Sequence, residues 1–559
     1  MSFKFRCVST VLFISASLVV NAQTVKKAID KISENLGTVQ TSKTQYDQEI
    51  EVLENGYALI SISEIDSKGK TETTEYEFSF SDIDPNTVRS ITKKDLIQVQ
   101  LLVRGKQKMI KKIEDSGEKV NFDNEIYLFA SDIDNARNLV EAIKKTIPLS
   151  EKMELGKLSL SGYKQHINWL MKNIVEVDNA DEKYIQNLTN DSKNSGYASL
   201  EVIEQTKSKA VTTRYEFNFS LLNPNSLDLD IKNKAFSIEV STRRNAKFIK
   251  VYKDGIQQSY DKSLELYTGS MEKTKQVYKV LQDIIPLAED AFAKSMPNIT
   301  TRSKAIDYIN GQVEEVSSES TGFIQNFSDD CVTQFQVEKT TSKGSEVTIL
   351  TFNFADLNAG AIEFGTQKEL LFIEIPVNQK AKLINVVKDG EQENYTDEFK
   401  IYINSVEAAI ISIKAIENII SSCKSSLENA KISSKSTALK QLTAAIKPIS
   451  INRDNYEQAF EIVSQKDGLV KFTKIFSDEK KSREQIYEFG FEDINPRSVK
   501  METKGKNVQV ELKTKYLEKI IKAYEDGEIK SYENELVIEA ESVENARKIV
   551  MLLKSVAAE

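Results

Sequence analysis

Apolar and polar residues alternate at period two along much of this chain, which indicates antiparallel β-structure interrupted by a few amphipathic helices. The clearest strand carries two phenylalanines two residues apart, so both side chains point to one face. This strand occurs four times, with Phe78 and Phe80, Phe217 and Phe219, Phe352 and Phe354, and Phe489 and Phe491. We expect each pair to lie in a hydrophobic core.

The segment around each phenylalanine pair is one of two landmarks of an internal repeat. It reads YEFSFSDIDPNTV from Tyr76, YEFNFSLLNPNSL from Tyr215, LTFNFADLNAGAI from Leu350 and YEFGFEDINPRSV from Tyr487, at intervals of 139, 135 and 137 residues. The second landmark is a hairpin turn, which reads EDSGEKVNF near Gly117, KDGIQQSY at Gly255, KDGEQENY at Gly390 and EDGEIKSY at Gly527. Because both landmarks keep the same spacing, the chain contains four tandem copies of one unit.

Both landmarks carry residues typical of turns. Pro85, Pro224 and Pro496 end the strand, since proline cannot donate to a ladder and the neighbouring Asp or Asn closes the turn with its side chain. The third repeat has Ala359 there, which predicts a looser turn. Asp-Gly between alternating strands predicts a hairpin, and Asp115-Ser116-Gly117 in the first repeat predicts a bulged variant.

Each repeat closes with an amphipathic helix and opens with a shorter one. In the first repeat, the closing helix carries the apolar residues Ala136, Leu139, Val140, Ile143 and Ile147. The predicted N-caps of the four closing helices are Asp132, Ser270, Ser405 and Ser542. An acid follows two residues later in every repeat, where the helix dipole favours negative charge.

Together these patterns predict an α+β protein of four tandem repeats. Each repeat is expected to contain a short N-terminal helix, about seven antiparallel strands in a sandwich or partly open barrel, and a C-terminal helix. In the first repeat, the strands are expected at residues 44–52, 57–64, 72–80, 87–91, 95–103, 107–114 and 123–130. The predicted boundaries are 1–22 for a signal peptide, then 23–150, 151–295, 296–428 and 429–559 for the repeats.

Seven strands followed by one amphipathic helix resembles the pleckstrin-homology-like fold. The resemblance implies two curved, nearly orthogonal sheets with a helix closing one end, and the alternative is another antiparallel sheet or barrel with a packed helix. It concerns strand order and not motif. The closing helices lack the tryptophan typical of that family, since Trp169 lies in an opening helix. Glu54-Asn55-Gly56 and Gln465-Lys466-Asp467-Gly468 also lack the bases of a phosphoinositide clamp.

Residues 1–22 have the features of a secretory signal peptide. Lys4 and Arg6 precede an apolar run from Val11 to Val20, and Val20-Asn21-Ala22 places small residues at the cleavage site. The run is shorter than the ~20 residues that a spanning helix needs. The sequence therefore predicts an exported protein, periplasmic or secreted, with no integral membrane segment after cleavage.

The charge balance argues against nucleic acid as a partner. The formal net charge of the 559-residue chain is −9, and it becomes −11 without Lys4 and Arg6 because residues 1–22 contain no acid. An acidic exported chain is a poor candidate for binding nucleic acid.

Sequence motifs of catalysis and metal binding are absent. His166 is the only histidine, and we expect it to be solvated or at the core boundary of an opening helix, which argues against a zinc site or a Ser-His-Asp triad. The chain has no Cys-x-x-Cys, no Walker-type loop and no Gly-x-Gly-x-x-Gly. Asp82 and Asp84 form a turn without the ordered oxygen spacing of a calcium loop. We predict no catalytic residue, no metal and no cofactor.

Basic residues cluster on the middle strands of three repeats. They are Arg104, Lys106, Lys108, Arg243, Arg244, Lys247, Lys513 and Lys515. Such clusters bind an anionic ligand, dock against the acidic face of the next repeat, or only keep exposed strands soluble, and the pattern leaves these alternatives open. Cys331 and Cys423 either pair as a disulfide in an oxidising compartment or remain buried thiols.

These features favour a non-catalytic, exported binding or scaffold protein. Its partner would be a protein or polysaccharide of the envelope or the extracellular space, since tandem copies suit multivalent attachment. The alternative is a carrier that encloses a small apolar ligand in each repeat, which requires a dry cavity of ~300 Å3 or more.

Overall fold

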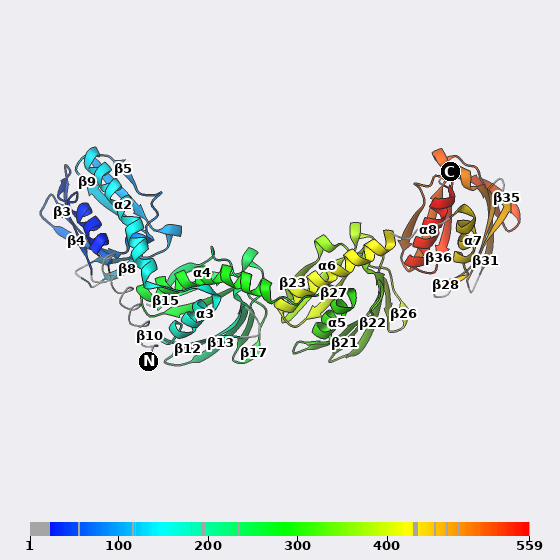
Figure 1. The fold of residues 1–559 in the computed structure, drawn as a ribbon, viewed down its shortest axis with the longest axis horizontal. Coiled ribbons are helices and arrows are strands. Elements are labelled where there is room, and N and C mark those ends of the chain that lie inside the picture. The colour runs from blue at the N-terminus through cyan, green and yellow to red at the C-terminus, as the bar shows by residue number, and fades with distance from the viewer. Residues whose placement is uncertain are drawn as a thin grey trace, which may run out of the picture. The chain divides into compact units, whose positions relative to one another are not determined.

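Four sheet-and-helix modules make up the computed structural model of this chain (Figure 1). It describes residues 23–557 apart from 54–55, 115–116, 118, 180–181, 192–195, 233–234, 429–433, 452–453, 465–467 and 479–480. The predicted signal peptide, and the Asp115 and Ser116 of the predicted bulge, lie outside the described residues. The chain divides into two compact units, Met1–Ser295 with the first and second modules and Met296–Glu559 with the third and fourth.

The first unit contains two modules with the same succession of elements. The first module has a helix over residues 23–33, then β1 (Val39–Gln40), β2 (Thr44–Val52), β3 (Ala58–Asp66), β4 (Thr71–Phe78), η1 (Phe80–Asp82), β5 (Arg89–Lys93), β6 (Leu96–Leu102), η2 (Arg104–Lys106), β7 (Ile110–Glu114), β8 (Lys119–Asp123), β9 (Glu125–Ala130) and α2 (Ile133–Lys157). The second has α3 (Gly162–Asn173), β10 (Val177–Asn179), β11 (Glu182–Asn190), β12 (Tyr197–Thr206), β13 (Ala210–Asn218), η4 (Phe219–Leu221), β14 (Asp228–Lys232), β15 (Ala235–Ser241), η5 (Arg243–Asn245), β16 (Lys250–Lys253), β17 (Ile256–Gln257), β18 (Ser263–Thr268) and α4 (Met271–Ser295).

The second unit repeats this succession. The third module has α5 (Arg302–Val313), β19 (Glu315–Ser317), β20 (Thr321–Phe327), β21 (Val332–Thr341), β22 (Gly344–Asn353), η6 (Phe354–Asp356), η7 (Ala359–Ala361), β23 (Glu363–Gln367), β24 (Leu370–Pro376), η8 (Asn378–Lys380), β25 (Asn385–Lys388), β26 (Glu391–Gln392), β27 (Glu398–Ile403) and α6 (Val406–Glu428). The fourth has α7 (Lys435–Ala445), β28 (Ile449–Ile451), β29 (Asp454–Ser464), β30 (Leu469–Ser477), β31 (Ser482–Gly490), η9 (Phe491–Asp493), β32 (Lys500–Lys504), β33 (Asn507–Lys513), η10 (Lys515–Leu517), β34 (Ile521–Glu525), β35 (Glu528–Glu533), β36 (Glu535–Ala540) and α8 (Val543–Ala557).

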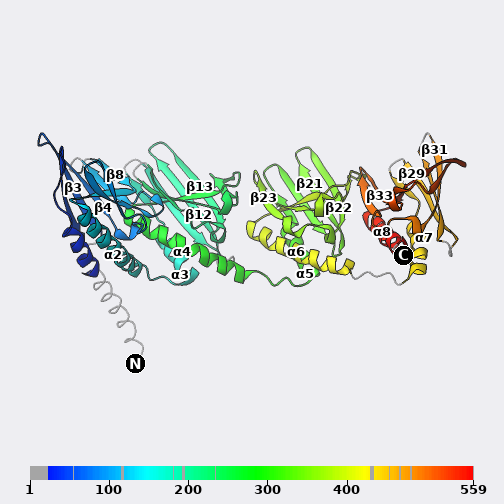
Figure 2. The same ribbon diagram turned by 90° about the horizontal axis from the view of Figure 1, so that it is seen from above.

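Each module consists of a six-stranded and a three-stranded antiparallel sheet. In the first module the orders are β1-β2-β3-β4-β7-β8 and β5-β6-β9, so the chain passes between the sheets more than once. The two short strands β1 and β8 add to the seven expected from the sequence. The opening and closing helices pack together, as α3 and α4 do in Figure 2.

The phenylalanine pairs lie in separate cores, as predicted. Phe78 and Phe80 belong to the cluster of the first module, and the pairs at Phe217 and Phe489 belong to those of the second and fourth. In the first module the rings make an edge contact with centroids 5.0 Å apart. The strand ends at Phe78, however, and Phe80 begins a 3-10 turn, so the turn and not the strand presents the second ring to the core.

A buried glutamine joins the two sheets of every module and was not anticipated from the sequence. In the second module, Gln186 on β11 donates to the carbonyl of Tyr267 on β18 at 2.8 Å and accepts from its N–H at 2.8 Å. It also donates to the carbonyl of Val175 at 2.9 Å. The equivalent residues, with the same bonds to the last strand, are Gln48, Gln325 and Gln458. The side chain replaces a missing ladder bond and partly closes the module into a barrel.

The closing helices begin at the predicted N-caps. Asp132 Oδ1 accepts from the N–H of Asn135 at 2.7 Å, and Ser270, Ser405 and Ser542 make the same bond. In the third module Cys331 and Cys423 form a disulfide that links the start of β21 to α6. Within the described residues, no helix has the length and apolar character needed to cross a membrane.

Candidate binding cleft and the module junction

The first unit contains a cleft of about 350 Å3 where the first and second modules meet. Its walls come from η1, η2 and the end of α2 in the first module and from α4 in the second. The lining residues include Asp82, Arg104, Met109, Glu151, Lys275, Tyr278, Lys279, Gln282 and Asp283.

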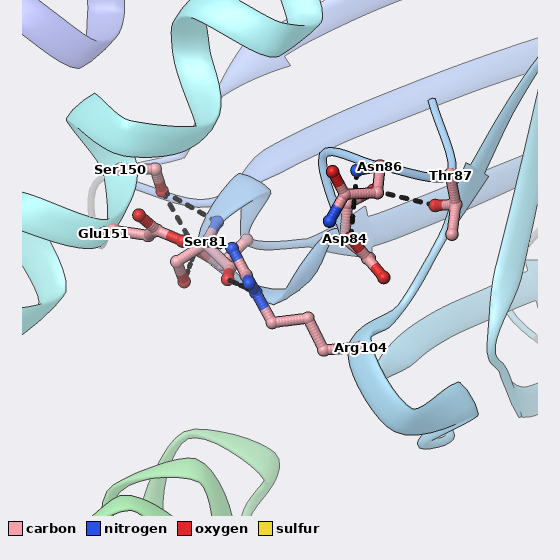
Figure 3. Close-up of polar contacts among 8 residues, drawn as sticks. Ser81, Asp84, Asn86, Thr87, Arg104, Ser150 and Glu151 are labelled. Carbon is pink, nitrogen blue, oxygen red and sulfur yellow. Dashed lines mark hydrogen bonds and ion pairs between the residues drawn. The ribbon is translucent and has the colours of Figure 1, made fainter. Parts of the chain in front are cut away.

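Local turn chemistry positions the first wall of the cleft. Ser79 caps η1 by accepting from the N–H of Ser81 at 3.3 Å, and Ser150 of α2 accepts from the same N–H at 3.2 Å. Arg104 reaches from η2 to donate to the carbonyl of Ser81 at 3.4 Å, and it forms an ion pair with Glu151 of α2 (Figure 3). The arginine therefore ties the two 3-10 turns to the closing helix.

An ion pair crosses from the second wall to the first. Lys275 of α4 pairs with Asp82 of η1, and both side chains are nearly buried. The ammonium group also lies 4.4 Å from the ring centre of Tyr57, where the ring face attracts a cation. Burial, and then the negative charge of Asp82, raises the pKa of the Tyr57 phenol, which stays protonated and neutral beside the pair.

The three bases of the cleft are paired with acids within the chain, and the lining carries one acid more, Glu154. Arg104 pairs with Glu151, Lys275 with Asp82, and Lys279 with Asp283 at 2.8 Å. Burial raises the pKa of Tyr278 on the same wall, so its hydroxyl is also neutral. This lining suits a neutral polar group better than a strongly anionic one.

The basic residues selected from the sequence occupy equivalent turns in different modules. Arg104 and Lys106 lie in η2 and Lys108 follows it, Arg243 and Arg244 lie in η5 and Lys247 follows it, and Lys513 and Lys515 lie at the end of β33 and in η10. Each group shares one turn, so the eight residues do not converge on one site. Arg243 pairs with Glu289 as Arg104 does with Glu151, and Lys513 pairs with Glu511 at 2.8 Å and Glu535 at 3.2 Å.

His166 is buried, contrary to the expectation of a solvated or boundary position. Its Nδ1 lies 2.8 Å from the carbonyl oxygen of Gly162, one turn earlier in α3, to which it donates. The helix backbone satisfies this ring nitrogen, so the ring packs without a charged partner.

The acidic turn of the first module uses its oxygens internally. Asp84 Oδ1 accepts from the N–H of Asn86 at 2.9 Å, and the hydroxyl of Thr87 donates to the Asp84 carbonyl at 2.7 Å (Figure 3). Asn223 and Asn495 accept the same N–H bond in the second and fourth modules. In the third module, where Ala359 replaces proline, the short 3-10 turn η7 lacks this side-chain cap. Among the described residues, no group of three or more His, Cys, Asp or Glu side chains is arranged to hold a metal ion.

The second unit repeats the ion pair between modules at equivalent positions. Arg547 of α8 pairs with Asp356 of η6 at 2.5 Å. Asp356 holds the position of Asp82 in its module, and Arg547 holds that of Lys275 in the closing helix. Both pairs belong to what we call the module junction, the contact between consecutive modules within a unit.

Two further contacts lie at similar places in the two module junctions but differ in their atoms. After the second 3-10 turn, the side chain of Gln107 accepts from the N–H of Leu229 at 2.8 Å, whereas the carbonyl of Lys382, one position later in its module, accepts from the hydroxyl of Thr503 at 2.7 Å. Five residues after the hairpin glycine, Phe122 packs edge-on against Phe236 at 5.2 Å. The equivalent Tyr395 donates its N–H to Gly505 at 3.1 Å and joins the core of the fourth module.

Searches against protein-family models, curated proteins and solved structures find no match to this chain.

Proposed function

We propose that this chain is an exported, non-catalytic binding or scaffold protein of the cell envelope or the extracellular space. The observation that carries the proposal is the module junction, which recurs with equivalent residues in both units. Repeated contacts between neighbours are how tandem-repeat proteins build extended surfaces, and repeated surfaces bind with avidity.

The described chemistry supports binding in preference to catalysis. The three bases of the cleft are paired with acids of its walls, and His166 is held by its own helix backbone. A cleft of about 350 Å3 whose bases are already paired suits a sugar unit or a neutral peptide side chain. We therefore propose a protein or polysaccharide as the partner.

The carrier alternative receives no support from the second module. The enclosed apolar cavity in its core, lined by Phe217, Phe219 and Leu281 among others, has a volume of about 10 Å3. That volume is about the minimum that a single water molecule requires. A small apolar ligand would need the core to open.

We further propose that the modules, predicted at residues 23–150, 151–295, 296–428 and 429–559, are related to the pleckstrin-homology-like fold, with the first boundary moved to the end of α2 at Lys157. Support comes from two antiparallel sheets followed by a closing helix in each module. In each module the chain alternates between the two sheets, so the strands of one sheet are not all consecutive along the chain.

A pull-down with residues 23–559 as bait, from envelope and culture fractions, tests the function. We expect specific capture of a protein or polysaccharide, and a native chain outside the cytoplasm that begins at Gln23. Gln282→Trp, which fills the cleft, should weaken capture of a ligand held there, whereas Gln205→Trp on the exposed side of β12 should not. Retention of the chain in the cytoplasm with its first 22 residues intact, or capture of nothing specific, contradicts the proposal.

A further inference from the structure

The two module junctions join different surfaces of consecutive modules. The acid face is formed by Asp82, Met109 and Phe122 in the first module and by Asp356, Leu383 and Tyr395 in the third. The base face is formed by Leu229, Met271 and Lys275 in the second module and by Met501, Val543 and Arg547 in the fourth. Because the two faces differ, the contact is heterologous, and among the described residues no module covers the base face of the first module or the acid face of the fourth.

The acid face of the fourth module is exposed, although it carries two large apolar side chains. Asp493 holds the position of Asp82, and Ile520 and Tyr532 hold those of Met109 and Phe122. Tyr532 is 52% exposed and Ile520 is 37% exposed, whereas Met109 and Tyr395 are buried. The isolated bridge between Ile494 and Thr514 places η9 beside η10, so these residues share one surface.

Two further apolar residues extend this surface. Tyr516 and Leu517 are 91% and 59% exposed in η10, at the positions that Gly105 and Lys106 hold in the first module. Tyr516 has a φ of 55°, and Arg244 and Gln379 have a φ of 57° at the same position, so this left-handed conformation belongs to the turn of the module. The exposed tyrosine side chain, however, contributes nothing to the core, which points to a partner outside the module.

The base face of the first module offers the complementary charge. Arg137 holds the position of Lys275, and its side chain is 73% exposed. It pairs with Asp134 of the same helix at 2.9 Å, just as Arg547 pairs with Glu544 while it also contacts Asp356. Ile133, at the position of the packed Met271, is 61% exposed. A groove of about 540 Å3 adjoins them between β5 and α2, and its lining contains four bases and one acid: Val88, Arg89, Ser90, Arg137, Val140, Glu141, Lys144 and Lys145.

Where one module lacks the acid of the acid face, the next module lacks the base of the base face. The second module has Leu221 at the position of the acid, and the third has Ile410 at that of the base. The first and last modules retain Arg137 and Asp493, which match each other in charge. Two bases, Lys515 and Lys519, lie near Asp493. They do not argue against its pairing with a base, because Arg104 and Lys108 hold the same positions near Asp82, which does pair with Lys275.

We propose that the chain associates head to tail, with the acid face of the fourth module of one copy docked on the base face of the first module of a second copy. Asp493 pairs with Arg137 of that copy, and Ile520 and Tyr532 cover its Ile133. The inference rests on the proposed scaffold function and names the partner as the chain itself. A heterologous contact of this kind produces a ring or an open filament.

Sedimentation velocity of residues 23–559 between about 1 and 300 μM tests the association over the range in which contacts of modest area bind. We expect mass to grow with concentration beyond the monomer. Arg137→Glu and Asp493→Lys should each weaken association at least about tenfold, since like charges meet at the contact. The variant carrying both substitutions should recover it, because the charges are exchanged and again match.

Tyr532→Asp provides a second test that does not disturb a buried group, and it should also weaken association. Lys70→Glu, in the exposed hairpin between β3 and β4, is the matched control and should associate as the unsubstituted chain does. A chain that stays monomeric over the whole range overturns the inference, as does a double variant that fails to regain association. If the chain stays monomeric but specifically captures another molecule, the proposed binding function holds and only the self-association is wrong.

Discussion

At the scale of single residues, the ion pair between Asp82 and Lys275 is sensitive to the loss of either partner. Both side chains are nearly buried, so Asp82→Ala leaves the lysine without its partner charge. We expect the free energy of unfolding of the first unit to fall by about 2–4 kcal/mol, measured by denaturant titration.

The same pair should be replaceable by apolar residues. Asp82→Leu combined with Lys275→Ile should recover most of the loss, because a packed apolar pair replaces a buried ion pair at little cost. The chain itself carries Leu221 and Ile410 at the equivalent positions. Glu72→Ala in the exposed pair with Lys70 is the control and should cost less than about 0.5 kcal/mol. An Asp82→Ala variant as stable as this control would show that the pair does not hold the junction.

Gly527 illustrates how a backbone conformation restricts the side chain. Asp526 and Gly527 both have positive φ, at 49° and 88°, and Asp526 accepts from the N–H of Glu484 on the adjacent strand at 3.0 Å. Gly527→Val should destabilise the fourth module by about 1 kcal/mol or more. Gly311→Ala is the opposite case and should not destabilise the chain. Gly311 lies inside α5 with open space around it, and alanine favours a helix. If calorimetry showed no loss of stability for Gly527→Val, the assignment of a positive-φ turn at Gly527 would be wrong.

Residue patterns predicted the local features well because each depends on a few neighbours in sequence. The Asp-Gly turns, the N-caps at Asp132 and Ser270 and the buried phenylalanine pairs follow from spacing alone. Asp82 was interpreted only as a turn residue, since its partner lies 193 residues away. No local pattern distinguishes such an acid from a solvated one.

At the scale of elements, the glutamine that joins the two sheets decides whether a module closes. Gln186→Ala removes three hydrogen bonds from backbone groups of β18 and of the segment after α3. Each unsatisfied buried group costs about 1–3 kcal/mol, so we expect a loss of at least about 2 kcal/mol and faster hydrogen exchange in β18.

Gln205→Ala, on the same sheet but exposed, provides the comparison and should be close to neutral. Equal stability of the two variants would mean that water replaces the amide of Gln186 and that the bridge does not hold the sheets together. The role of Gln186 was not predicted because a single glutamine among alternating residues looks like an outward-facing side chain. The strand β8 was also missed, although Val120 and Phe122 alternate within it and β5, of the same length, was predicted.

At the scale of the whole molecule, the number of modules was predictable and the way in which they connect was not. The repeats are visible because each module must bury its own phenylalanines and close its own hairpin. The module junction combines residues of two modules, such as Tyr395 in the core of the fourth, and its positions differ in identity from one repeat to the next. The basic residues were noticed as clusters, but the acids of Arg104 and Arg243 come from closing helices farther along the chain, Glu151 and Glu289.

If the junction couples neighbouring modules, a change on one side must reach the other. Asp356→Ala removes the partner of Arg547, which belongs to the fourth module, and should weaken the packing of Tyr395 and Leu383 there. Core amides of both the third and the fourth modules should then exchange at least about tenfold faster, corresponding to 1.4 kcal/mol, while those of the first module keep their rates. Lys388→Ala, in an exposed pair with Glu346 of the third module, should change neither. Faster exchange confined to the third module would mean that the two modules fold independently and that the ion pair is only a surface contact.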